Sequence, residues 1–293
     1  MTDILDKPLV FDEALQLHRV KNILPTTLDS AGIKEQLGKD IYQRAFISAT
    51  VNDAKTLDHF HTGIQQILEG RNNPGDVRLA YNRMIEEQGG DPLPMYRQNL
   101  IIDTNLATAR GYGQMVKQND PDIVDAWPAL ELIRGGVREF PRGDPHYKPG
   151  TDGSFDWDDR WQDALDECDD DPADVEAMQK VFTETGRRIA LKDSSIWHAL
   201  GDGAGGREDT LGNQFAPFAF ESGMVTENVS REECEAVGLL DTGDAAGAGD
   251  VPDFNDSFEQ DAVIEAAFLR QILATAIAGV GKVNETKQVV EAV

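Results

Sequence analysis

The stretch at residues 91–115, DPLPMYRQNLIIDTNLATARGYGQM, decides the fold expected for the first half of the chain. It opens with Asp91-Pro92, a pairing typical of a helix start. Its apolar residues recur at helical spacing and are Leu93, Tyr96, Leu100, Ala107, Gly111 and Met115. The small side chains of Ala107, Ala109 and Gly111 would let a neighbouring segment approach closely. The stretch therefore predicts one long helix with a close-packing face.

The segments around this helix extend the pattern. Residues 57–68 carry an apolar helical stripe, and Asn73-Pro74 opens another helix that Gly89-Gly90 ends. Further along, residues 188–191 and 224–226 are strand candidates, and Ser230 begins a capping box. We therefore expect an α+β protein with a helix-rich N-terminal half, a small mixed α/β C-terminal part and a separate C-terminal helix.

The domain organisation follows from shifts in composition. We expect an N-terminal helical arm at 1–50, a main domain at 51–240, an acidic flexible linker at 241–256 and an amphipathic helix at 257–293. Within the main domain, residues 150–176 are strongly acidic and indicate a solvated insertion. The last helix has a broad apolar face that either packs on the body or binds a partner; its candidate partner-binding residues are Phe258, Ile264, Phe268, Ile272, Leu273 and Ile277.

The charge of the chain argues against some classes of function. The 293 residues include 27 Lys and Arg against 53 Asp and Glu, a formal net charge of −26. Such a balance argues against a nucleic-acid-binding surface and against binding to an anionic membrane. We see no spanning segment and no leader, so we expect a soluble protein without a cleaved export signal. The excess of carboxylates indicates salt adaptation or simply acidic loops.

The sequence contains no recognisable catalytic, metal-binding or phosphate-binding motif. The five histidines are scattered, and His61 lies on an apolar stripe, which favours a packed residue over a metal ligand. The glycine-rich residues 201–206 lack the Lys and Ser/Thr of a phosphate loop. Ser222 lacks the first glycine of a nucleophile elbow. Two cysteines, Cys168 and Cys234, form neither a disulfide framework nor a zinc site. We therefore expect no catalytic residue, no metal ligand and no cofactor.

Several segments, taken in order, form a larger pattern between residues 10 and 240. The first half contributes Ala45-Phe46-Ile47-Ser48-Ala49, the helix residues Arg97, Thr104 and Asn105, then Gly111-Tyr112-Gly113-Gln114 and Asp125-Ala126-Trp127-Pro128-Ala129. The second half contributes residues 190–197, which end in Trp197, and residues 216–224, which include Pro217 and Gly223.

In order and spacing these segments resemble the phage Mu F-like minor head proteins, also called head morphogenesis proteins. The resemblance implies a structural protein of a tailed virus, located inside the head or at the portal vertex, and in the host cytoplasm during assembly. Its implied partners are the portal protein, the major coat protein or both, with self-association left open. Many relatives end in a Cys-x-Cys motif, which residues 217–224 lack, so no metal or thiol role is carried over.

Three hypotheses remain open at this point. The first is a virion-associated minor head protein that is not an enzyme and acts in head assembly and genome packaging or delivery. The second is a transient scaffold that is absent from mature particles. The third is a salt-adapted hydrolase, which would need a pocket that holds two carboxylates with raised pKa values.

Overall fold

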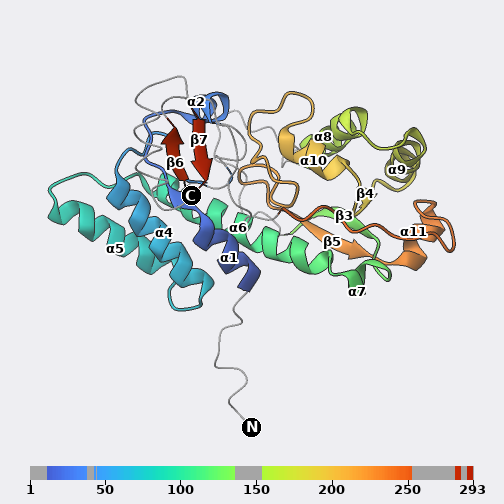
Figure 1. The fold of residues 1–293 in the computed structure, drawn as a ribbon, viewed down its shortest axis with the longest axis horizontal. Coiled ribbons are helices and arrows are strands. Elements are labelled where there is room, and N and C mark those ends of the chain that lie inside the picture. Colours follow the sequence, from blue (N-terminus) through green and yellow to red (C-terminus); the bar gives the residue numbers. More distant parts are fainter. Residues whose placement is uncertain are drawn as a thin grey trace, which may run out of the picture. The chain divides into compact units, whose positions relative to one another are not determined.

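The structure is a computed structural model and describes residues 12–37, 43, 45–135, 154–252, 281–284 and 289–292. The chain divides into two compact units, of which unit 1 is Met1–Arg110 with Pro252–Val293 and unit 2 is Gly111–Val251. The long helix expected from the sequence is α6, Met95–Gln118, and the boundary between the units falls within it (Figure 1). It begins at Met95, after Pro92 and Pro94, because the residue before a proline is disfavoured in helical conformation.

Unit 1 is mainly helical. Its elements before α6 are α1 (Asp12–Val20), β1 (Asn22–Ile23), α2 (Ser30–Gln36), β2 (Ala45–Phe46), α4 (Ala54–Leu68) and α5 (Pro74–Glu87). The strands β1 and β2 form a short parallel pair. The side chain of Asp53 caps α4 by accepting a hydrogen bond from Thr56 N at 2.9 Å, and Asn73 caps α5 in the same way.

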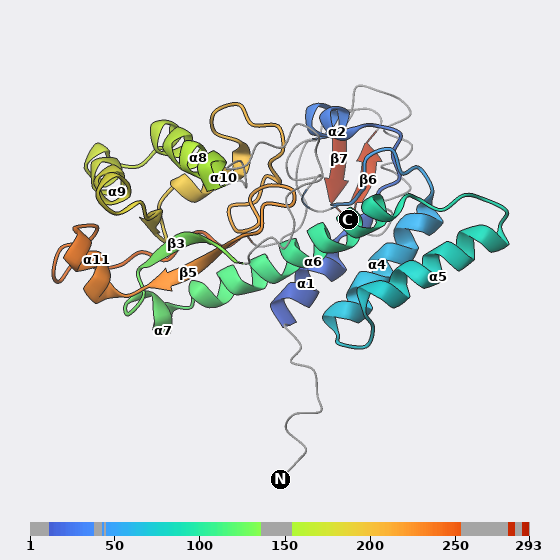
Figure 2. The ribbon, with the colours of Figure 1, turned by 180° about the vertical axis from the view of Figure 1, so that it is seen from behind.

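The core of unit 1 forms where α4 meets its neighbours. The stripe predicted at residues 57–68 is buried, with Leu57, Phe60 and Ile64 fully covered. Helices α4 and α5 lie side by side in both views of the ribbon (Figure 2). They can pack closely because Gly63 has no side chain: a Cβ there would lie 2.6 Å from Cγ1 of Val77.

Unit 2 is built on a three-stranded antiparallel sheet with strand order β4-β3-β5. The strands are β3 (Ala129–Arg134), β4 (Ile189–Leu191) and β5 (Met224–Val229), so both strand predictions are confirmed. The remaining elements are α7 (Pro121–Val124), α8 (Ser154–Glu167), α9 (Pro172–Thr185), α10 (Ile196–Asp202) and α11 (Arg231–Val237). Ser230 caps α11 as its sequence predicts, since its Oγ accepts from Glu233 N at 3.3 Å. The predicted α+β class with a helix-rich N-terminal half is thus confirmed.

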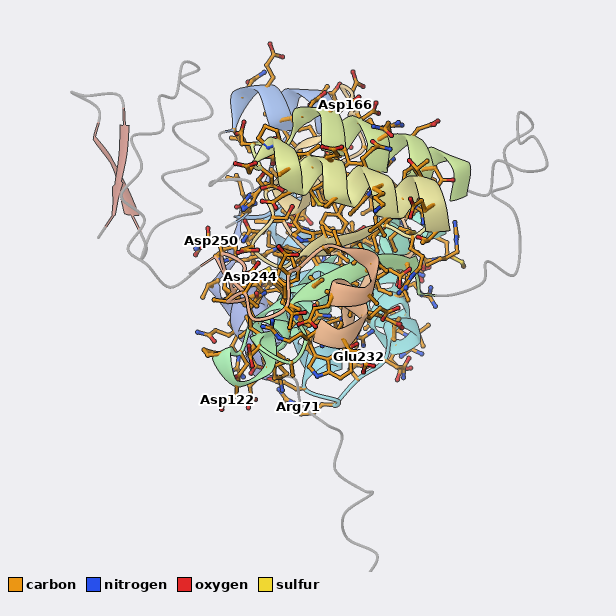
Figure 3. All side chains as sticks on the ribbon, turned by 90° about the vertical axis from the view of Figure 1, so that its right-hand side faces the viewer. Arg71, Asp122, Asp166, Glu232, Asp244 and Asp250 are labelled. Atoms are coloured by element: carbon orange, nitrogen blue, oxygen red, sulfur yellow. The ribbon has the colours of Figure 1, made fainter. Side chains whose placement is uncertain are left out.

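The prediction of a solvated insertion at 150–176 is wrong for the described part of that stretch. Residues 154–167 form α8, and Trp157, Trp161, Ala164 and Leu165 are each at most 3% exposed. These positions recur at helical spacing, and the acidic residues lie between them on the outer face. Figure 3 shows one of them, Asp166, pointing away from the ribbon. The acidic composition hid an amphipathic helix.

The prediction for the C-terminal segment is wrong over its described residues. Gly281–Asn284 (β6) and Val289–Ala292 (β7) form an antiparallel pair where a helix was expected. The valines of these stretches favour strand because they are branched at Cβ. The predicted partner-binding residues lie outside the described residues: Phe258, Ile264, Phe268, Ile272, Leu273 and Ile277. Residues 241–252 contain no helix or strand.

Candidate functional site

The resemblance residues of unit 2 meet in an aromatic cluster. Trp197 on α10 is 4% exposed, and its ring lies 6.1 Å from that of Phe218 and 5.8 Å from that of Trp161. Its indole Nε1 donates to Leu191 O at 2.8 Å, which links α10 to the end of β4. The indole N–H of Trp161 is buried with no hydrogen-bond partner among the described residues. The cluster packs two resemblance segments, 190–197 and 216–224, against each other.

The loop at residues 210–223 closes this cluster, and we call it the closing loop. Leu211 N donates to Phe218 O at 2.8 Å, and the Asn213 side chain donates to the carbonyl of Pro217 at 3.3 Å. Gly223 ends the loop at φ +63°, a conformation that disfavours residues with a Cβ. Its carbonyl accepts from Gly135 N at 2.9 Å, beside the end of β3. Pro217 therefore takes part in a bond within the loop, and Gly223 joins the end of the loop to the sheet.

The second half of α6 packs on the closing loop. A Cβ at Gly111 would lie 1.6 Å from the carbonyl oxygen of Ala216, so only glycine fits at this contact. Further along α6, Gln114 Nε2 donates to Thr226 O at 2.6 Å, and Gln118 Nε2 donates to the same carbonyl at 3.3 Å. The prediction that small residues on α6 permit close approach is confirmed at Gly111.

The resemblance residues of unit 1 form a separate contact. Arg97 on α6 donates from Nη2 to Ala49 O at 2.6 Å and to Ser48 Oγ at 3.3 Å, and so joins α6 to the segment after β2. Asn105 bonds to its own helix at Ile101 O, and Thr104 is half-buried. These three residues therefore do not meet Trp197, Pro217 and Gly223 in one site. They lie in unit 1, and the others lie in unit 2.

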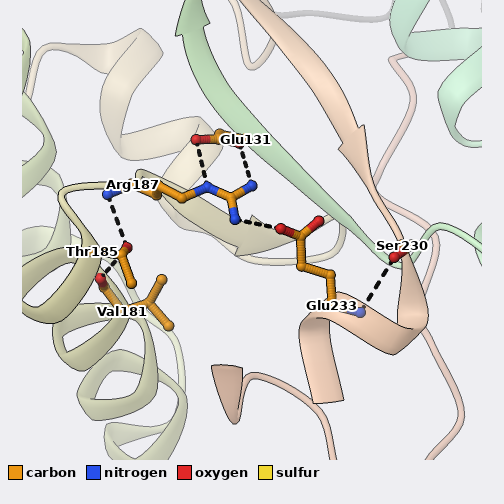
Figure 4. Close-up of polar contacts among 6 residues, drawn as sticks. All are labelled: Glu131, Val181, Thr185, Arg187, Ser230 and Glu233. Carbon is orange, nitrogen blue, oxygen red and sulfur yellow. Dashed lines mark hydrogen bonds and ion pairs between the residues drawn. The ribbon is translucent and has the colours of Figure 1, made fainter. Parts of the chain in front are cut away.

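An arginine in unit 2 joins three elements, and no sequence pattern pointed to it (Figure 4). Arg187, between α9 and β4, binds Glu131 on β3 through two hydrogen bonds, Nε to Oε1 at 3.0 Å and Nη2 to Oε2 at 2.6 Å. Its Nη1 donates to Glu233 on α11. Hydrogen bonding to Glu131 is the main cause that raises the pKa of Arg187. Thr185 Oγ1 accepts from Arg187 N at 3.1 Å and orders the backbone there.

Similar pairs recur across unit 2. Arg160 binds both oxygens of Asp209, at 2.8 and 2.6 Å, and its guanidinium lies 5.1 Å from the centre of the Trp157 ring. Three further pairs are Arg188 with Asp158, Arg207 with Asp163 and Arg231 with Asp125. The partners lie 30 to 106 residues apart in the sequence, so sequence spacing gives no signal for them.

One cavity in unit 2 bears on the hydrolase hypothesis. It measures about 160 Å³ and is lined by Asp170, Asp174 and Asp193 over an apolar floor that includes Met178 and Leu239. Burial, and then repulsion from neighbouring acids, raises the pKa of Asp174. Asp170, however, accepts hydrogen bonds from Ser194 Oγ at 2.5 Å and from Ser195 N at 2.8 Å. That carboxylate is engaged in ordering the start of α10.

The described residues contain no cluster of His, Cys, Asp or Glu that could hold a metal ion. Cys168 and Cys234 are free thiols, and burial raises the pKa of both, to about 11 for Cys234. A raised pKa disfavours the thiolate, which is the nucleophilic form. His61 packs against His18 as its apolar stripe predicts. Within the described part of the chain, no helix has the length and apolar character needed to cross a membrane.

Comparison with known proteins finds no match to this chain. No protein-family model, no curated protein and no solved structure matches the chain.

Proposed function

We propose that this protein is a structural minor head protein of a tailed virus, of the Mu F-like kind. It lies inside the head near the portal, binds the portal protein or the major coat protein, and acts in head assembly and in genome packaging or delivery. It works through surfaces and packing and is not an enzyme.

One observation carries this proposal: the segments that resemble the family contact one another. Arg97 bonds to the backbone and side chain of residues 48–49, Gly111 abuts Ala216, and the Trp197 ring stacks on Phe218. The separations in sequence are large, so these are tertiary contacts and not consequences of neighbouring positions. Segments that belong to one motif set are expected to serve a shared core, and this packing supports that reading.

The location of the protein in particles tests the proposal. Proheads and mature particles of the virus that encodes the chain would be purified, and their proteins measured by quantitative mass spectrometry. We expect the protein in both, in few copies per particle relative to the coat protein. Presence in proheads with loss from mature particles would favour the transient scaffold, and absence from both would refute any role in the head.

A matched pair of variants links the particle result to the structure. Gly111→Ala should lower incorporation, because a Cβ at Gly111 would meet the backbone of the closing loop. Ala107→Ser, at an exposed position one helical turn earlier and outside that contact, is the control for an atom added to α6. Equal incorporation of both variants, at equal amounts of folded protein, would mean that incorporation into particles does not need the contact between α6 and the closing loop.

A further inference from the structure

Residues 241–251, which we call the strap, run along unit 2 although their composition predicts a flexible linker. The amide of Gly249 donates to Asn119 Oδ1 at 2.6 Å. The side chain of Arg231 donates to the carbonyl of Asp244 at 3.0 Å, and that of Gln214 donates to the carbonyl of Asp250. Three contacts thus hold the backbone of the strap along most of its length.

Gly247 and Gly249 of the strap face the body of unit 2. A Cβ at Gly249 would lie 2.4 Å from the carbonyl oxygen of Lys192, and one at Gly247 would lie 1.8 Å from Oδ2 of Asp193. Ala248, between the two glycines, is exposed. The alternation of inward glycine and outward alanine means that the sequence fits this surface, whereas a free linker would need no such order. Figure 3 shows the strap acids Asp244 and Asp250 at the surface.

The contacts between the strap and unit 2 are weak enough to break while unit 2 stays folded. The apolar core of unit 2 includes Leu239 and Leu240 but no residue of the strap. Segments that bury little apolar surface and rely on a few exposed hydrogen bonds open without unfolding of the whole domain. The strap also ends at residue 251, where the chain passes from unit 2 into the second part of unit 1.

We propose that the strap is a releasable latch, which fixes the point where the chain leaves unit 2 at residue 251 and on release moves that point back to residue 240. Eleven residues extend by at most about 3.3 Å each, so the end of the released strap can lie anywhere within about 36 Å of residue 240. The docked strap is held on unit 2 up to Asp250, whereas the released strap is held only at its first end. This inference does not depend on the proposed function.

Hydrogen exchange of the full chain tests the latch, followed by mass spectrometry of peptides that cover the strap and the β3–β5 sheet. In the wild type we expect the Gly249 amide, which donates to Asn119, to exchange at least about tenfold more slowly than unstructured chain, and faster than amides of the sheet. Gly249→Val should remove the protection of the strap and leave that of the sheet unchanged. Ala248→Val, which adds the same branched side chain on the outer side, should behave as the wild type.

Three results would overturn the latch. Exchange of the wild-type strap at the unstructured rate would mean that it is not docked. Exchange of strap and sheet together, in wild type or variant, would mean that it cannot open alone. Equal effects of Gly249→Val and Ala248→Val would mean that the glycine fit does not matter. If Gly249→Val does not fold, Gln214→Ala removes a single strap contact and should speed exchange of the strap alone.

Discussion

Two histidines in unit 1 should make the protein sensitive to mild acid. His18 on α1 and His61 on α4 stack with ring centres 4.3 Å apart. The Nε2 of His18 lies 2.9 Å from His61 O, and the Nε2 of His61 lies 3.1 Å from His18 O. Since each carbonyl can only accept, each Nε2 must carry the proton of a neutral ring. A second proton on either ring would place a charge in a buried stack.

The size of the effect follows from the pKa of His18. Burial, and then the neighbouring His61, lowers it from 6.5 to about 3. The unfolded chain therefore binds a proton below pH 6.5 that the folded chain refuses until about pH 3, so stability falls as the pH falls through this window. At pH 5 the gap is about 1.5 pH units, worth about 2 kcal/mol. The pKa of His61 is also lowered, which adds loss in the same direction.

Urea denaturation at several pH values between 7.5 and 5 measures this loss. Carboxylates ordinarily titrate near pH 4, so this range isolates the histidines. His18→Gln keeps an amide donor but cannot gain a charge, and should show about 2 kcal/mol less acid loss at pH 5 than the wild type. His198→Gln, a half-buried histidine of unit 2, is the matched control for histidine loss elsewhere.

The reasoning fails if His18→Gln keeps the full acid dependence of the wild type. A direct check is the NMR titration of the His18 ring in the folded protein. Its signals should stay those of a neutral ring down to about pH 4. A midpoint near 6.5 would show that the stack accepts a proton without cost.

Three further predictions concern unit 2. Gly111→Ala should cost about 3 kcal/mol in urea denaturation, because its Cβ meets the Ala216 backbone; a loss below about 1 kcal/mol would contradict this contact. Arg187→Ala should cost about 2 kcal/mol, since it leaves Glu131 without its two hydrogen bonds, and Arg187→Lys should recover only part of that loss in the same assay. Lys192 is buried with its pKa lowered to about 8, so Lys192→Met should stabilise the protein at pH 7 by up to about 3 kcal/mol. That gain should shrink between pH 8 and 10.5, where the wild type itself becomes more stable, and a gain that does not depend on pH would refute the assignment.

Local signals in the sequence predicted most of the regular structure. The predicted caps Asn73 and Ser230 each begin a helix, because a side-chain acceptor next to an apolar stripe favours that one geometry. The strand at residues 189–191 was equally visible from its apolar, branched composition. Helix α8 was missed because its acids dominate the composition while only its spacing reveals the buried face of Trp157 and Trp161.

The tertiary contacts could not be predicted in the same way. The two carboxylate partners of Arg187 lie 56 and 46 residues away, and they meet only because β3 pairs with β4 while α11 follows β5. The small residue Gly111 predicted that a neighbouring segment would approach α6 closely, but it did not identify that segment as the one that carries the Ala216 carbonyl. The strap was taken for a free linker, since composition alone does not distinguish a glycine that fits a surface from one that avoids structure.

The arginine pairs of unit 2 have a consequence for how added salt acts on the protein. The side chains of Arg160, Arg188 and Arg207 are 9%, 16% and 22% exposed, and those of their partners Asp209, Asp158 and Asp163 are 47%, 43% and 36% exposed, so dissolved ions screen these half-covered pairs only in part. The acids without such partners are spread over the outside, where the Debye length shrinks to about 3 Å at 1 M salt. Concentrated salt should therefore weaken the repulsion among exposed acids more than the attraction within the arginine–carboxylate pairs. Added salt should then raise the stability of the folded chain, whereas it would lower that of a protein held together by fully exposed ion pairs.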